Sequence, residues 1–137
     1  VRETRRVMGD YVITAEELAA GKRFDDVIVH KAEFIVDIHN PAGAGQAESK
    51  IQYVKPYDLP YRCFVPRHIE NLYVAGRCIS GTHRAHASYR VMSICMAMGE
   101  AVGIAASLCA KKKCTPRTLD VHELQNCMTS KGIDLFS

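Results

Sequence analysis

Two histidines are the side chains in this sequence best suited to moving a proton. His83 and His86 have H-x-x-H spacing and lie in a polar stretch that precedes a long apolar segment. Imidazole titrates near neutral pH, so either ring can act as a proton donor or acceptor. The spacing would also suit two ligands of a metal ion, but no third ligand is evident nearby, and we expect no metal. We take His83 and His86 as candidate catalytic residues; the alternative is a pair that bonds loop carbonyls.

The elements around these histidines resemble a ligand-binding edge of an α/β sheet. Asn71–Gly76 is a short apolar run ending in glycine, typical of a parallel strand buried on both faces. A glycine at the carboxyl end of such a strand lets a ligand approach the backbone. The helix that follows is predicted from Ala87 or Ser88 to Ala110, with Ser88 as N-cap and the histidines in the loop before it. Its free N–H groups suit an anion, for which a phosphate and a reduced flavin are candidates.

The predicted long helix is apolar nearly all round, so we expect it to be buried on most sides. Gly99 and Gly103 lie one turn apart and predict the close approach of a neighbouring backbone. A membrane anchor over Val91–Ala110 is the alternative. Glu100 at the midpoint and a composition of Ala, Gly, Ser, Met and Cys argue against it. We therefore expect no membrane.

The first half of the chain is predicted to be mostly an antiparallel sheet with one small helix. Thr14 and Glu17 have the spacing of a capping box, and Gly21 would end that helix within about two turns. Four short runs are predicted strands, namely Asp26–His30, Glu33–His39, Ser49–Val54 and Tyr61–Val65, with a loop over Asn40–Gly45. A polar helix over Thr118–Ser130, stopped by Gly132, is expected near the end of the chain.

Charge and cysteine content restrict the partners. The net charge of +3, from 18 Lys and Arg against 15 Asp and Glu, is too mild to indicate nucleic acid. No pair among the six cysteines has C-x-x-C spacing, so reduced and mostly packed thiols are expected. Reduced thiols favour the cytoplasm, although the compartment itself stays open.

Longer runs of sequence resemble a known family. Asn71–Met92, which reads NLYVAGRCISGTHRAHASYRVM, together with Met98–Ala106, resembles the closing segment of FAD-dependent oxidoreductases that have the glutathione-reductase type of FAD domain. Arg5–Tyr11, Gly21–Asp26 and Pro60–Pro66 extend the resemblance over nearly the whole chain, closest to the bacterial group of that name. The G-x-G-x-x-G fingerprint that holds the FAD pyrophosphate in such proteins does not occur here. We therefore expect this chain to be the closing piece of a longer protein whose N-terminal FAD-domain portion is its first partner.

The resemblance implies an α+β or α/β piece of two domains. Residues 1–69 would form the end of an antiparallel substrate domain, and residues 70–111 the last strand and long buried helix of a Rossmann-like FAD domain. Residues 112–137 would be a C-terminal helical tail. The predicted activity of the intact protein is transfer of a hydride between a small organic substrate and FAD. The isolated chain is not expected to retain FAD.

The resemblance also assigns site residues. The glycine after the last strand would lie against the ribityl-phosphate part of FAD, and the next helix would point its N-terminus at the flavin. Many relatives carry an acid directly after that glycine, whereas this chain has Arg77. The candidate FAD-binding residues are Ala75, Gly76, Arg77, Tyr89, Arg90 and Val91, and the candidate substrate-binding residues are Tyr61 and Arg62.

Two other classes of function stay open at this stage. Histidine, Tyr89 and Arg90 are also the residue types with which a polysaccharide lyase abstracts a proton and neutralises a uronate. Their adjacent positions at a helix start argue against a shared site. The second alternative is a non-catalytic module that packs on a partner, including a second copy through the Gly99 and Gly103 face.

Overall fold

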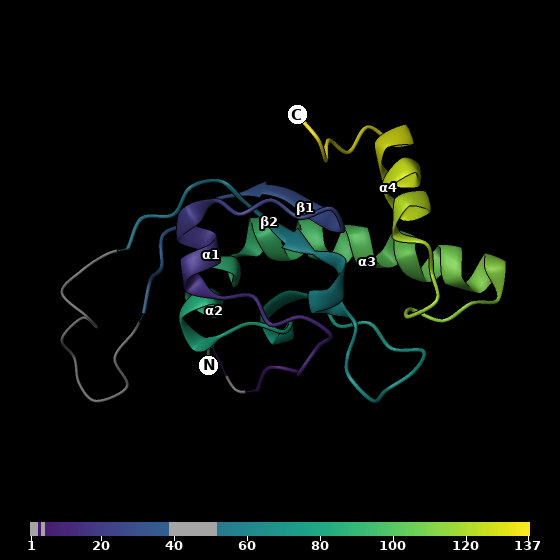
Figure 1. The fold of residues 1–137 in the computed structure, drawn as a ribbon, viewed down its shortest axis with the longest axis horizontal. Coiled ribbons are helices and arrows are strands. Elements are labelled where there is room, and N and C mark those ends of the chain that lie inside the picture. Colours follow the sequence, from purple (N-terminus) through teal and green to yellow (C-terminus); the bar gives the residue numbers. More distant parts are fainter. Residues whose placement is uncertain (1–2, 4, 39–51) are drawn as a thin grey trace.

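A computed structural model describes residues 3, 5–38 and 52–137. The chain has a mixed α+β fold in which a two-stranded antiparallel sheet packs against the longest helix (Figure 1). Two short helices lie at one end of the sheet, and the last helix lies near the opposite end of the longest one. The elements are α1 (Ala15–Ala20), β1 (Val27–Ala32), β2 (Tyr57–Pro60), η1 (Tyr61–Phe64), η2 (Gly76–Cys78), α2 (His83–Tyr89), α3 (Met92–Lys112) and α4 (Val121–Ser130).

The capping box predicted for the first helix is present. The Glu17 N–H donates to Thr14 Oγ1 at 3.3 Å, and the Thr14 N–H donates to Glu17 Oε2 at 3.0 Å. These two bonds satisfy donors that a helix start otherwise leaves without partners. Gly21 ends α1 in the left-handed region, with φ of 65°. Leu18, on the inner face of α1, is fully buried in the core.

The sheet contains only β1 and β2, and its register is irregular. Val27 pairs with Pro60, Val29 with Leu59 and Ala32 with Tyr57, with a register shift between successive pairs. Asp58 of β2 is buried and accepts bonds from Arg23 Nη1 at 2.8 Å and His30 Nδ1 at 2.9 Å. The backbone N–H groups of Phe24 and Lys31 donate to the same carboxylate. Because every donor comes from β1 or the turn before it, Asp58 fixes how the two strands meet.

Two of the predicted strands, Glu33–His39 and Tyr61–Val65, are not strands in the described structure. Residues 33–38 contain a single isolated bridge, from Val36 to Gln52, rather than a strand. Tyr61–Val65 is not a strand, because β2 ends at Pro60 and the chain curls into η1. Asp26 causes that curl: its carbonyl accepts the Tyr61 N–H at 2.7 Å, and its carboxylate accepts the Arg62 N–H at 3.2 Å.

The remaining predictions in that region are only partly testable. His39, the Asn40–Gly45 loop and Ser49–Ile51 lie outside the described residues. The described remainder of the Ser49–Val54 run makes the Gln52 bridge and no longer pairing. The one strand predicted correctly, Asp26–His30, is β1, which begins one residue later and extends to Ala32.

The predicted single helix over residues 87–110 is two helices. α2 runs through the stretch that was expected to be a loop, so both histidines are helical, and Thr82 rather than Ser88 is its N-cap. Ser88 is instead fully buried, where its Oγ donates to the Phe34 carbonyl and bonds the Tyr57 hydroxyl, which lies 2.9 Å away. The chain then leaves the helical conformation at Val91, with ψ of 153°, and α3 begins at Met92. Burial of the whole of Ala85–Tyr89 explains why the helix stops and turns here.

Asn71–Gly76 forms no strand. The one backbone–backbone bond that the described structure shows between it and another segment runs from the Val74 N–H to the Phe64 carbonyl, at 3.0 Å. Leu72 is 41% exposed, so the run is not buried on both faces. A buried parallel strand needs a hydrogen-bonded strand on each side. Within the described residues no strand lies beside this segment, and the prediction of a parallel strand is therefore wrong for this structure.

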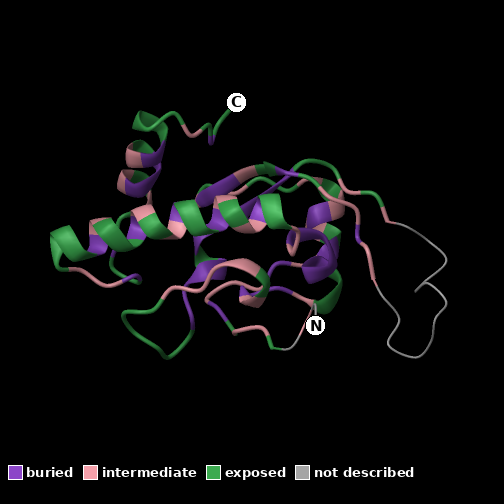
Figure 2. Ribbon diagram, turned by 180° about the vertical axis from the view of Figure 1, so that it is seen from behind, coloured by how far each residue is buried: buried purple, intermediate pink, exposed green. Residues whose placement is uncertain are grey.

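α3 buries one stripe and leaves the opposite face open. The buried residues are Ile94, Met98, Ala101, Ala105 and Cys109, which recur every three or four positions. Met92 and Met96 are 83% and 75% exposed, and a Cβ built at Gly99 or Gly103 meets nothing within 4 Å. Figure 2 shows the exposed face running along the helix. The expectations that α3 is buried on most sides and that a backbone packs on its glycines are therefore not met.

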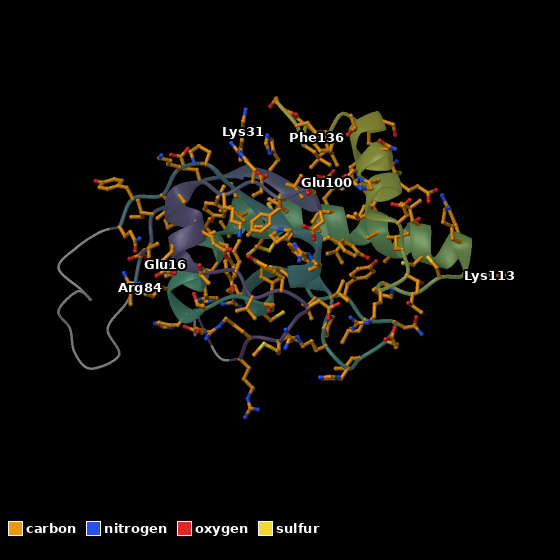
Figure 3. All side chains as sticks on the ribbon, viewed as in Figure 1. Glu16, Lys31, Arg84, Glu100, Lys113 and Phe136 are labelled. Atoms are coloured by element: carbon orange, nitrogen blue, oxygen red, sulfur yellow. The ribbon has the colours of Figure 1, made fainter. Side chains whose placement is uncertain are left out.

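α3 is also long and apolar enough to cross a membrane by length and composition. A helix that forms part of a soluble core passes the same test, and Glu100 is exposed on this one, near the middle of its length (Figure 3). The expectation that no membrane is involved stays a prediction. α4 begins after Asp120, which caps it through the His122 N–H, and ends before Gly132, three residues shorter than predicted at its start.

Two glycine substitutions should have opposite effects on stability. A Cβ at Gly81 would lie 2.7 Å from the ring and hydroxyl of Tyr89, which is fully buried and cannot retreat. We expect Gly81→Ala to lower the free energy of unfolding by about 1–3 kcal/mol through overpacking. Gly103→Ala adds a methyl group at a mid-helix position where nothing lies within 4 Å of it. This substitution should raise the free energy of unfolding by up to ~1 kcal/mol. Urea unfolding followed by circular dichroism measures both, and equal effects of the two variants would contradict this packing.

Candidate functional site

Gly76 forms a cradle against the first turns of α3. It has φ of 82°, a conformation that favours glycine, and its N–H donates to Met98 Sδ at 3.2 Å. A Cβ at Gly76 would find only Cys95 Sγ within 4 Å, at 3.9 Å. Space therefore remains on the side of the backbone where a side chain would project. The chain passes from extended Ala75 through Gly76 to the exposed Arg77 at this point.

The N-terminus of α3 carries positive character without a capping side chain. Val91 occupies the N-cap position and offers no oxygen, and the first turn holds no acidic residue. The first N–H groups of the helix thus lack the side-chain partner that Thr14 supplies to α1. Arg90, directly before Val91, is anchored by its Nη2 on the Asp37 carbonyl at 2.9 Å and on Asp37 Oδ2 at 3.2 Å. A helix start of this kind accepts an anionic group.

His86 is a buried imidazole, and one of its ring nitrogens has no hydrogen-bond partner. Its side chain is 3% exposed, and its ring packs edge-on against Tyr89 with centroids 5.6 Å apart. Nδ1 lies 3.7 Å from Glu3 Oε2, whereas Nε2 is buried without a hydrogen-bond partner. A carboxylate beside Nδ1 favours the tautomer that carries its proton there. Nε2 then keeps a free lone pair, which is the state a proton acceptor needs.

Burial and surrounding cations keep His86 neutral. Desolvation is the largest cause, followed by the charges of Arg6, Arg90, His83 and Arg77, and together they lower its pKa to about 4. Arg77 follows the Gly76 cradle, and Arg90 precedes the N-terminus of α3. These two arginines therefore help to lower the pKa of His86 and also bring positive charge to the region of the helix start. At neutral pH the ring is therefore an uncharged base next to a positively charged anion-accepting edge.

Glu3 joins the two histidines. Its Oε2 lies 2.7 Å from Nδ1 of His83, and the same oxygen is the nearest acid to His86. Arg6 pairs with Glu3 through Nη1 and donates from Nε to the Gly81 carbonyl at 2.8 Å. His83 is 60% exposed and His86 is buried, so the two rings differ in access to solvent. Sequence reasoning missed Glu3, because nothing in its local pattern indicates that it lies beside α2.

The predicted FAD-binding residues fall into two groups. Gly76 lies against Cys95 and Met98 in the first two turns of α3, with Ala75 and Arg77 on either side of it in the chain, and Arg90 and Val91 directly precede that helix. Tyr89 is different, because its side chain is fully buried and its hydroxyl donates to the Ile79 carbonyl at 3.2 Å. Only the backbone of Tyr89, whose carbonyl accepts a bond from Cys95 Sγ, faces the helix start.

The predicted substrate residues lie apart from this edge and have internal partners. The Tyr61 hydroxyl donates to the Pro116 carbonyl at 2.7 Å and bonds that of Tyr73. Arg62 forms a two-pronged pair with Asp26, from Nε at 2.9 Å and Nη2 at 3.2 Å, and its guanidinium stacks over Tyr11. The Asp26 bond raises the pKa of Arg62. Binding of substrate by Tyr61 and Arg62 stays a prediction.

The structure thus combines a helix start without a side-chain cap, a glycine with open space beside it and a buried neutral base. Comparison with known proteins identifies a family. The family of FAD dependent oxidoreductases matches residues 1–128, and the chain belongs to this family. No curated protein and no solved structure matches the chain.

The buried state of His86 can be tested by titration. With a pKa of about 4 in the folded chain and about 6.5 when unfolded, His86 takes up a proton in the unfolded state first as pH falls. Folded stability therefore decreases between about pH 6.5 and pH 4, by on the order of 2–3 kcal/mol. His86→Gln should remove this part of the pH dependence. Urea unfolding at pH 7 and pH 4.5 measures it, and the His86 Cε1 proton signal should titrate near pH 4.

His122→Gln is the matched control, because His122 is exposed on α4 and its ring bonds the side chain of Gln125, within the same helix. It should leave the pH dependence of unfolding as it is in the parent chain. A His86 signal that titrates at its ordinary value near 6.5 would show that the ring is solvated, and would remove the basis for treating it as a buried base.

Proposed function

We propose that this chain supplies the closing edge of the FAD site in a flavoprotein oxidoreductase that transfers a hydride between a small organic substrate and FAD. The observation that carries the proposal is the Gly76 cradle against the uncapped N-terminus of α3. The residues present fit the cofactor, because Gly76 leaves room for it and the helix start with Arg77 and Arg90 suits its anionic groups. Membership of the family supports the same cofactor.

FAD, when bound, supplies the hydride acceptor or donor that no amino-acid side chain provides. The chain's own residues would hold and polarise it. Gly76 permits close backbone contact, and the N–H groups of residues 91–93 at the start of α3 stabilise negative charge at their end. Arg90 is fixed by Asp37 and so offers its charge in a set position. Glu3 and Arg6 hold the α2 segment that carries the histidines.

His86 is the proposed proton-transfer residue. Removal of a hydride from an alcohol or amine also requires removal of a proton, and a neutral imidazole with a free Nε2 can accept it. His83, which shares Glu3 with His86 and is exposed, provides a route for that proton to solvent. The remaining parts of the proposal follow the family resemblance: a division at residues 69 and 111, a Rossmann-like FAD domain and an N-terminal portion that carries the G-x-G-x-x-G motif.

Substitutions at Val91 test the helix start. Val91→Asp and Val91→Asn both give α3 a capping side chain of the same size and lose the same apolar contact. Only the aspartate places a negative charge where the cofactor's anionic group is proposed to lie. In the intact protein that contains this chain, we expect Asp to weaken FAD binding at least ~10-fold relative to Asn, about 1.4 kcal/mol. Fluorescence titration of the apoprotein with FAD measures it, and equal affinities would contradict the proposal.

A second test addresses His86. In the same intact protein, His86→Gln should slow reduction of the bound flavin by substrate by about 10²–10⁴-fold while FAD stoichiometry stays unchanged. His122→Gln should change neither quantity. Stopped-flow absorbance of the flavin gives the rate. Unaltered reduction in the His86 variant would leave the histidine a packing residue.

The chain of 137 residues alone is expected to bind FAD weakly, because the fingerprint glycines are absent from its sequence. Fluorescence quenching of FAD by the purified chain measures this affinity. A dissociation constant of about 1 μM or lower would overturn the proposed division of the cofactor site between this chain and an N-terminal portion.

A further inference from the structure

Two cysteines meet at the far end of α3, away from the proposed cofactor edge. α3 ends at Lys112, and Lys113 adopts the left-handed conformation with φ of 54°. Figure 3 shows Lys113 at the tip of the helix, opposite to the end at which α2 lies. The N–H of Cys114 donates to the Cys109 carbonyl at 3.1 Å, and the Lys113 N–H donates to the same oxygen.

The bond from Cys114 to Cys109 is the six-to-one bond of the Schellman motif, and it brings these two residues together. In this motif the residue after the left-handed position bonds the carbonyl five residues earlier, and a contact between the side chains of those two residues commonly accompanies the bond. In most helices the touching pair is apolar. Here the two positions are held by Cys109 and Cys114, and the neighbouring Cys114 thiol helps to raise the pKa of the Cys109 thiol. The contact therefore follows from how the helix ends.

The two thiols differ in exposure and share a surface pocket. Cys109 is 8% exposed and Cys114 is half-buried. Both line a pocket of about 460 Å³ with Asn71, Tyr73 and Lys113. The Tyr73 hydroxyl lies 3.3 Å from Cys109 Sγ. Burial raises the pKa of Cys109, so the more exposed Cys114 is the thiol that reacts first with a reagent in solution.

We propose that Cys109 and Cys114 form a dithiol site that undergoes thiol–disulfide exchange with low-molecular-weight disulfides. The Cys114 thiolate attacks one sulfur of the reagent, forms a mixed disulfide and releases one thiolate. The Cys109 thiolate then attacks the Cys114 sulfur, forms the internal disulfide and releases the second thiolate. Two electrons pass to the reagent, and the protons of the two cysteines pass to the released thiols.

The pocket gives the exchange a place to occur. A mixed disulfide on Cys114 needs room for the reagent's organic part, and the pocket beside both sulfurs provides it. Lys113 lies next to Cys114 and brings a positive charge, which suits a reagent with carboxylates, such as oxidised glutathione. Cys63, by contrast, is fully buried, and burial raises its pKa to about 12.

Glutathione redox buffers and mass spectrometry test this proposal on the folded chain. After acid quenching and alkylation, trypsin cleaves within the Lys111–Lys113 run, so a Cys109–Cys114 disulfide leaves two peptides joined: residues 91–111 and residues 114–117. Cys95→Ser serves as the parent, because Cys95 lies in the first of these peptides. We expect the joined species to become the main form under oxidised glutathione and to disappear under excess reduced glutathione.

Single-thiol variants establish the order of events. Cys109→Ser should accumulate a glutathione adduct on Cys114, and Cys114→Ser should leave Cys109 largely unmodified because of its burial. Cys127→Ser, which removes a half-buried thiol on α4, should leave formation of the joined species unchanged. Two results would overturn the proposal: a parent chain in which both thiols stay open to alkylation under oxidised glutathione, or one that stops at the Cys114 adduct without closing the internal disulfide.

Discussion

The break between α2 and α3 is the constraint on which the rest of the structure depends. A continuous helix would have carried Arg90 and Val91 inside its hydrogen-bond ladder and left no helix start near Gly76. The break arises because α2 is buried from Ala85 to Tyr89, with Tyr89 held by the Ile79 carbonyl and Arg90 held by Asp37. These anchors fix the direction of α2. Because the apolar face of α3 packs against the sheet, α3 has to start as a separate helix.

The break also divides the chemistry between two environments. On one side, His86 sits in the core, where loss of water and nearby cations keep it uncharged. On the other side, the first turn of α3 meets solvent, with Met92 largely exposed. In the proposed site, the base has to stay neutral and the helix end has to meet an anion, and these two roles have opposite requirements for water. The two-residue interruption places His86 in the core and the start of α3 at the surface.

Local signals were sufficient where neighbouring residues decide the conformation. The Thr14 and Glu17 capping box and the Gly21 stop rest on short-range bonds, and both could be predicted. The strand near Val27 was predicted from its own residues, although the strand that it pairs with lies far away in the sequence. Prediction failed where distant groups decide. The curl at Tyr61 depends on Asp26, the burial of Ser88 depends on Phe34 and Tyr57, and the tautomer of His86 depends on Glu3. The predicted helix start at Ser88 was also wrong, because α2 begins after Thr82 and α3 begins only after Val91.

Asp58 has a consequence for how the two-stranded sheet avoids mispairing. The ladder between β1 and β2 is interrupted by shifts, so its backbone bonds specify alignment only weakly. A slip of one residue would turn the Asp58 carboxylate to the other face of the sheet. All four of its donors would then lose their common acceptor, namely Arg23, Phe24, His30 and Lys31. The buried Asp58 carboxylate thus fixes the register of the two strands. A hairpin with shifted pairing is destabilised mainly by the loss of this carboxylate's hydrogen bonds rather than by the loss of bonds between the strands.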